Sequence, residues 1–353
     1  MKKPVLTILQ YLFFLGIGIF FIWLSVRHIH QAEWEAIKSA VRQAHHWLII
    51  PAILVLVLSH YSRAMRWKIL MEPLGYNPSN FNVFAAVMIG YLVNAGVPRL
   101  GEVVKCTILA KYEKVRVDRL VGTIVMERAV DIVCLIIAFI CALIFQGDVI
   151  NEHIFSKVGS FFHDPSGHIS IKKLVITLSV IVLFFGALFF VLKKFGHIDA
   201  VGKIKHVLVG ILHGLSSIRQ VRHKGWFLFH TFFIWAMYMT GTTLGIYALQ
   251  ETSHLGIGGG LATLVFGSIG MVIAPGGIGA YAWIISKLMG WYDLDEDTIG
   301  NALGWLLWTV QTVIVLVGGL VCFALLSAHN KEGNRDKRHK LREEKVLRKR
   351  GME

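Results

Sequence analysis

Apolar runs long enough to cross a membrane recur along this chain of 353 residues. A helix crosses a hydrocarbon core of about 30 Å with roughly 20 predominantly apolar residues. The sequence predicts full spans over 5–26, 47–71, 120–145, 171–192, 226–249 and 299–326. With 55% hydrophobic residues and a mean hydropathy of +0.61, these runs indicate an all-α polytopic membrane protein. We expect the first run to be a retained span, because it is longer than the apolar core of a signal peptide.

Two other apolar stretches are interrupted by Pro and Gly. The first interruption is NAGVPRLGE, residues 94–102, and the second is APGGIGAY, residues 274–281. The flanking helices are predicted over 81–97 and 101–111, and over 255–274 and 278–289. The first pair is too short to span comfortably, so we expect a re-entrant helical hairpin there and a second one at the later break. Paired interruptions of this kind mark the binding site in transporters built from inverted repeats.

Charge asymmetry predicts the orientation. The net charge is +14, and the basic segments are 63–68, 111–119, 193–224 and 329–350. If both termini are cytoplasmic, these segments all fall inside, whereas 147–170 and the acidic loop 293–297 fall outside. Amphipathic patterns over 31–45 and 201–218 predict two helices on the membrane surface.

This orientation gives a domain hypothesis. The first hairpin then enters from the cytoplasm and the second from outside, so the halves at about 47–145 and 226–327 have inverted topology. We expect six full spans and two re-entrant hairpins within a transmembrane domain over 1–327, followed by a basic cytoplasmic tail over 328–353.

The hairpin tips are the first candidate binding site. Each tip leads into a half-helix whose N-terminus points to the membrane centre, where free N–H groups and the helix dipole attract anions. Glycines in the second tip let a headgroup approach the backbone, and charged or polar groups flank the first tip. The candidate residues are Asn94, Arg99, Glu102, Lys105, Gly276, Gly277 and Gly279. The alternative is that Pro and Gly only permit close helix packing.

Three ionisable residues lie inside the span that begins near residue 120. At 1.5 Å per residue, Glu127, Arg128 and Asp131 lie roughly 12 to 18 Å into the membrane. Glu127 and Asp131 share a helix face, so Arg128, Arg99 or a proton must offset their repulsion. Two interpretations remain open: a proton-coupled relay that also uses Glu102, and a structural ion cluster that holds the hairpin.

Two further groups are candidates for substrate contact. His60, Arg63 and Arg66 are spaced three residues apart, so they line one helix face near the cytoplasmic interface. They are placed either to receive a lipid phosphate from the inner leaflet or to anchor the helix by snorkelling. Gln311 and Thr312 lie near the middle of the last span, either lining a cavity or bonding a neighbouring helix.

Several other function classes are disfavoured. The four cysteines lie in apolar runs without zinc or disulfide spacing, and no metal or cofactor is expected. The basic tail is typical of a segment facing anionic lipid rather than nucleic acid. Residues 165–168, PSGH, match one motif of the lipid phosphatases, but the upstream and downstream motifs of that enzyme class are missing, so we expect no enzyme activity.

Four motifs in order resemble the flippase-like transmembrane domain of bacterial lysylphosphatidylglycerol synthases. They are Arg63-x-x-Arg66-Trp67, the 94–102 break, Glu127-Arg128-x-x-Asp131 and Pro275-Gly276-Gly277-Ile278-Gly279. The resemblance covers about residues 5–327 and implies movement of phospholipids between leaflets. Some members carry a soluble aminoacyl-transfer domain, for which the residues after Ala328 are too few, so we expect no synthase activity.

Two positions depart from that family's pattern. Ala282 stands where members often carry an acidic residue after the second tip, and Lys105 stands where they often carry Arg. The substrate therefore need not be the same.

The sequence thus predicts a multi-pass lipid flippase of the bacterial cytoplasmic membrane. Its substrate would be a phospholipid or a polyprenyl-phosphate lipid with an anionic headgroup. The alternative is a non-transporting subunit that binds lipid for a lipid-modifying partner enzyme. Self-association into a homo-oligomer is compatible with both.

Overall fold

A computed structural model describes residues 16, 19–23, 27, 30–97, 99–150 and 221–349 of the chain. For residues 32, 33, 148, 150 and 332–349 it describes the backbone alone. The predicted span 171–192, the predicted surface helix 201–218, the PSGH motif and most of the first predicted span lie outside the described residues. The described residues are helical throughout, with short connections and no strand.

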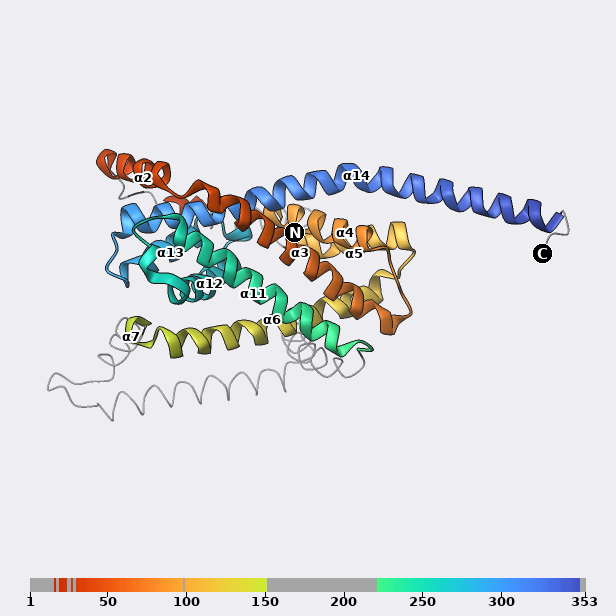
Figure 1. Ribbon diagram of the computed structural model, residues 1–353, viewed down its shortest axis with the longest axis horizontal. Coiled ribbons are helices and arrows are strands. Elements are labelled where there is room, and N and C mark those ends of the chain that lie inside the picture. Colours follow the sequence, from red (N-terminus) through yellow and green to blue (C-terminus); the bar gives the residue numbers. More distant parts are fainter. Residues whose placement is uncertain are drawn as a thin grey trace, which may run out of the picture.

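The helices follow the apolar runs closely. Their bounds are α2 Gln31–Gln43, α3 Ile49–Met71, α4 Asn80–Gly96, α5 Leu100–Glu113, α6 Val117–Phe145, α7 Gly147–Ile150, α11 Lys224–Ala248, α12 Gly256–Ile273, α13 Ala280–Gly290 and α14 Asn301–Lys349. Helix α14 runs without a break from the last predicted span into the basic tail (Figure 1). The helix predicted over 31–45 is present as α2, and its place on the membrane surface stays a prediction.

Helices from the two halves of the sequence pack against each other. Helix α3 runs along α11, and α4 packs against both its hairpin partner α5 and the C-terminal α14. Helix α12 contacts α11, α6 and its own partner α13, which in turn packs on α14 (Figure 1). The two halves therefore share one helical body.

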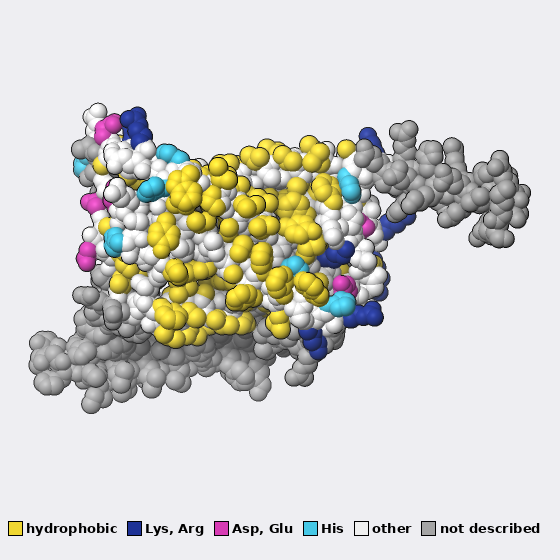
Figure 2. Space-filling view, viewed as in Figure 1, with side chains coloured by type: hydrophobic (Ala, Val, Ile, Leu, Met, Phe, Trp, Pro, Cys, Tyr) yellow, Lys and Arg dark blue, Asp and Glu magenta, His cyan; other side chains and the backbone are white. Residues whose placement is uncertain are grey.

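Within the described residues, four helical segments are long and apolar enough to cross a membrane. They are His46–Leu74, Val117–Phe145, Ser253–Ile273 and Glu296–Lys331. The second of the two expected hairpins thus contributes an arm of spanning length, α12, whereas α11, which we expected to span, does not meet these criteria. Figure 2 shows apolar side chains across the middle of one face and charged side chains gathered at its ends. The protein is therefore a membrane protein, and the count of six spans with two re-entrant hairpins stays a prediction.

Both interrupted stretches form helical hairpins. Helix α4 ends at Gly96, Arg99 adopts a left-handed backbone with φ of 65°, and α5 begins at the next residue. In the second hairpin a 3-10 turn over Pro275–Gly277 separates α12 from α13. Proline cannot continue the hydrogen-bond ladder of a helix, and glycine adopts positive φ at no steric cost, so the sequence breaks both helices where it was expected to.

The two tips lie against each other. Helix α4 packs on the turn Pro275–Gly277. A Cβ atom placed on Gly276 would lie 3.6 Å from the Cα of Ala95. The tips therefore contact each other, and the inverted-repeat arrangement stays a prediction.

Candidate functional site

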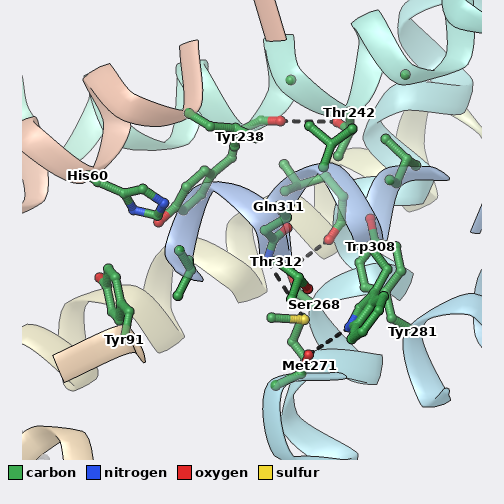
Figure 3. Close-up of a pocket in the computed structure, with 18 of the residues that line it drawn as sticks. His60, Tyr91, Tyr238, Thr242, Ser268, Met271, Tyr281, Trp308, Gln311 and Thr312 are labelled. Atoms are coloured by element: carbon green, nitrogen blue, oxygen red, sulfur yellow. Dashed lines mark hydrogen bonds between the residues drawn. The ribbon is translucent and has the colours of Figure 1, made fainter. Parts of the chain in front are cut away.

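A cavity of ≈ 890 Å³ lies beside the meeting tips. Its walls come from both halves of the chain: α3, α4 and α6 on one side, and α11, α12, α14 and the second tip on the other. Most lining residues are apolar. The polar and aromatic ones are His60, Arg63, Tyr91, Asn94, Arg128, Asp131, Trp235, Tyr238, Thr242, Ser268, Tyr281, Trp308, Gln311 and Thr312. Figure 3 shows how several of them face the interior. A largely apolar pocket with a few polar groups is typical of a ligand site.

A buried ion cluster closes one end of this cavity. The guanidinium groups of Arg63 and Arg66 donate to the two carboxylate oxygens of Asp131 at 3.0 and 2.7 Å. The ammonium of Lys105 donates to Glu127 at 3.0 Å, and Arg63 reaches the same carboxylate at 3.5 Å. The cluster thus joins α3, α5 and α6, and it ties the first hairpin to the body of the protein.

The pairing follows from the spacing of the residues on their helices. Arg63 and Arg66 lie three apart on α3, and Glu127 and Asp131 lie four apart on α6, so each pair shares one helix face. Arg66 is fully buried, and Arg63 and Glu127 are 7% and 2% exposed. Charges this deep are stable only when they are paired and hydrogen-bonded.

These contacts correct the expected partners of the two carboxylates. We expected Arg128, Arg99 or a proton to offset Glu127 and Asp131. Neither arginine forms an ion pair with them, but Arg128 lies close enough to Glu127 to attract it electrostatically. Arg128 instead pairs with Glu102 at 2.8 Å on a more exposed surface. The contacts fit the ion-cluster interpretation, and a proton-coupled relay stays a prediction.

The cluster also changes the interpretation of the α3 arginines. Arg66 does not extend to the protein surface as a snorkelling anchor, because it is fully buried against a carboxylate, and Arg63 is nearly buried in the same cluster. Arg63 still lines the cavity, so contact with a lipid phosphate remains compatible with its position. Arg66 lies behind Arg63 and is a buried partner of Asp131.

The first tip is organised by Asn94. Its side-chain oxygen accepts a hydrogen bond from the backbone N–H of Gly101 at 2.8 Å, across the break. One of the free N–H groups expected to attract an anion is therefore occupied by this side chain. Arg99 is exposed, adopts the strained left-handed backbone and has no ion-pair partner among the described residues. A non-glycine residue held in this conformation is often found at a functional site.

The second tip is organised by glycine and Trp308. Gly276, Gly277 and Gly279 have φ of 59°, 70° and 70°. The indole of Trp308 donates to the backbone carbonyl of Gly276 at 2.8 Å (Figure 3). The backbone N–H of Gly277 donates within the tip, to the carbonyl of Ala274 at 2.9 Å. This tip therefore carries little charge, and Gly276 is the one of its three glycines that lines the cavity, whereas Gly277 and Gly279 pack against other parts of the protein.

The predicted site residues divide into two groups. Those that line the cavity are Arg63, Asn94, Arg128, Asp131, Gly276 and Gln311. Those that lie around it without lining it are Arg66, Arg99, Glu102, Lys105, Glu127, Gly277 and Gly279. Thr312 also lines the cavity, as one of its two interpretations predicted.

Sequence reasoning missed an aromatic set on the cavity wall. Tyr91 on α4 and Trp235 and Tyr238 on α11 all line the cavity, next to His60. Aromatic residues in apolar helices give no signal that separates a cavity wall from a lipid-facing surface. No group of three metal-ligating side chains that could hold an ion is found in the described part of the chain.

Comparison with known proteins places these features in context. The model of the lysylphosphatidylglycerol synthase TM region family matches residues 8–317. A curated relative, the UPF0104 membrane protein MJ1595 of Methanocaldococcus jannaschii, is 29% identical over 133 residues, which is 37% of this chain and 36% of the relative. The matched segment thus covers little more than a third of that protein. No solved structure matches the chain.

Proposed function

Because this chain belongs to the lysylphosphatidylglycerol synthase TM region family, we propose that it moves a phospholipid or polyprenyl-phosphate lipid between membrane leaflets. The headgroup occupies the cavity between the two hairpin tips while the acyl or prenyl chains stay in the bilayer. The observation that carries this proposal is the cavity itself, which is built by both halves of the chain at the point where the tips meet.

The charge on the cavity wall supports an anionic headgroup. The buried cluster contains three cations, Arg63, Arg66 and Lys105, and two carboxylates, Glu127 and Asp131. With all five groups ionised, one positive charge is left over, and Arg63 and Arg128 face the cavity. Arginine is suited to bidentate contact with phosphate oxygens. Arg99 at the nearby first tip has no carboxylate partner among the described residues and supplies a further cation for the headgroup.

The experiment compares two threonines on α11. Thr242 lines the cavity, whereas Thr240, two residues away, is exposed on the outer surface. Both hydroxyls donate to carbonyls in the preceding turn of α11, so replacing either with phenylalanine removes a similar internal bond. Leaflet exchange of headgroup-labelled phospholipids and of a labelled polyprenyl phosphate is measured in reconstituted vesicles for each variant. We expect exchange in wild type and Thr240→Phe, and strongly reduced exchange in Thr242→Phe.

The outcome separates a transporter from a binding protein. Exchange of no lipid, together with saturable lipid binding to the purified protein, would favour the accessory-subunit alternative. Equal exchange in both variants would show that lipid does not pass through this cavity.

A further inference from the structure

One end of the cavity carries polar groups that lack partners. His60 is 6% exposed, and neither of its ring nitrogens has a hydrogen-bond partner in the described part of the chain. The same is true of the buried indole nitrogen of Trp235. Both side chains line the cavity. Buried donors and acceptors without partners are rare and costly, so a group of this kind points to a ligand that supplies the missing bonds.

These groups form one continuous wall. The ring of His60 lies 5.2 Å from that of Tyr91, and the ring of Trp235 lies 6.2 Å from that of Tyr238. The guanidinium of Arg63 lies 5.8 Å from the ring of Tyr238, which joins this wall to the ion cluster. Figure 3 shows His60, Tyr91 and Tyr238 around the same end of the cavity. We call His60, Tyr91, Trp235 and Tyr238 the aromatic pole.

The charges beside the aromatic pole disfavour an amine. The charged side chains that line the cavity are Arg63, Arg128 and Asp131. Asp131 is already bound by Arg63 and Arg66, and no other carboxylate of the described residues lines this cavity. An ammonium headgroup would meet two guanidinium groups and no free carboxylate.

Hydroxyl groups match the aromatic pole. A neutral histidine offers one donor and one acceptor, tyrosine hydroxyls offer both, and the tryptophan indole offers a donor. A hydroxyl group both donates and accepts, whereas an ammonium group only donates. We propose that the aromatic pole binds the hydroxyl groups of an anionic lipid headgroup, so that the cavity selects glycerol-, polyol- or sugar-phosphate lipids over amine-bearing lipids. This inference rests on the proposed lipid transport.

Three labelled lipids in reconstituted vesicles test the inference. Phosphatidylglycerol carries a phosphodiester and two hydroxyls, phosphatidylethanol carries the same charge without hydroxyls, and phosphatidylethanolamine carries an amine. We expect leaflet exchange of phosphatidylglycerol to be roughly tenfold faster than exchange of either other lipid, the effect of one to two hydrogen bonds.

Two variants locate the selectivity. His60→Phe and Tyr238→Phe keep a ring but remove hydrogen-bonding atoms, and in each variant we expect the exchange rate of phosphatidylglycerol to fall to near the rate of phosphatidylethanol measured in the same variant. Tyr247→Phe is the matched control, because Tyr247 lies on the same helix α11, is 40% exposed and does not line the cavity. Folding of all three variants is checked by their thermal midpoints in detergent.

The outcomes distinguish failure of the hydroxyl selectivity from failure of the proposed lipid transport. Equal exchange of phosphatidylglycerol and phosphatidylethanol, or fastest exchange of phosphatidylethanolamine, overturns the hydroxyl selectivity and leaves lipid transport intact. Selectivity that survives in folded His60→Phe and Tyr238→Phe also overturns it. If no lipid exchanges above protein-free vesicles, the proposed function itself fails.

Discussion

The two hairpins have the same plan but different chemistry. Each is an apolar helix, a Pro- and Gly-containing break and a shorter return helix, and the breaks touch each other. The first hairpin carries Arg99, Glu102 and Lys105 close to its break, and Lys105 enters the buried ion cluster. The break of the second hairpin carries three glycines with positive φ and no charged residue.

This difference indicates a division of roles between the halves. The first half supplies charge at the cavity, and the second half supplies an uncharged tip whose glycines allow close packing. Both hairpins nevertheless close in the same way, through glycine. A Cβ atom on Gly101 would clash with the carbonyl oxygen of Gly90, and one on Gly270 would lie 2.7 Å from the Cα of Tyr281.

The ion cluster should give the largest effects on stability. Asp131→Asn leaves Arg63, Arg66 and Lys105 with one carboxylate, and breaking a buried pair in this way costs about 3–5 kcal/mol of the free energy of unfolding. Arg66→Met removes the surplus charge while keeping much of the side-chain volume, so we expect a smaller loss. SDS titration in mixed micelles measures both variants. A larger loss in Arg66→Met would contradict the charge count of the cluster.

The next largest effects on stability are expected at the glycine contacts. They test whether the helices of the two hairpins pack together in the same way. Gly101→Ala and Gly270→Ala each force two helices apart, which costs about 1–3 kcal/mol. Gly96→Ala is the control in the first hairpin, since no atom lies within 4 Å of a Cβ there and the backbone does not have positive φ. Thermal midpoints in detergent should fall for the first two variants only. A drop for one hairpin alone would show that they close differently.

Arg99 tests the role of charge at the first tip. Arg99→Gly removes the cation and also relieves the left-handed backbone, which stabilises the fold by about 1 kcal/mol. Lys114→Gly makes the same two changes at the other end of α5, where Lys114 has φ of 55° and does not line the cavity. We expect roughly tenfold slower lipid exchange in Arg99→Gly alone, the loss of one charge-assisted hydrogen bond. Equal exchange rates in both variants would remove Arg99 from the binding site.

Trp308 should give the smallest effect, at the second tip. Trp308→Phe loses the hydrogen bond to the carbonyl of Gly276, worth about 1 kcal/mol of stability. Hydrogen–deuterium exchange should show faster labelling of the Pro275–Gly277 turn, with α4 and α5 unchanged. Unchanged protection of that turn from hydrogen–deuterium exchange would mean that the backbone conformation of its glycines alone keeps the turn ordered.

Much of the fold could be predicted from the sequence. Apolar run length and the Pro and Gly breaks located α3, α4, α5, α6, α11, α12 and α13 to within a few residues, because each signal is local in the chain. The membrane assignment and the family resemblance were likewise confirmed. The spanning status of α11 and α12 was harder to predict, since it depends on how the helices lie in the bilayer.

The site was less predictable because it depends on which helix faces meet. The spacing of the residues predicted that Glu127 and Asp131 share one helix face and that Arg63 and Arg66 share another. It did not predict that these two faces pack together, because they lie more than 60 residues apart in the chain. For the same reason the sequence did not predict the aromatic pole, which combines residues of α3, α4 and α11. The role of Asn94 as a cap for Gly101 was also hidden, because it crosses the break.

Locking the two tips together tests lipid movement between them most directly. Ala95 and Gly276 lie close together, so a short bis-methanethiosulfonate reagent can join Ala95→Cys to Gly276→Cys, and each single variant, treated in the same way, controls for the four natural cysteines. We expect lipid exchange to stop in the cross-linked double variant and to return on reduction, because the headgroup has to pass between the tips. Undiminished exchange with the tips fully cross-linked would contradict a route between them.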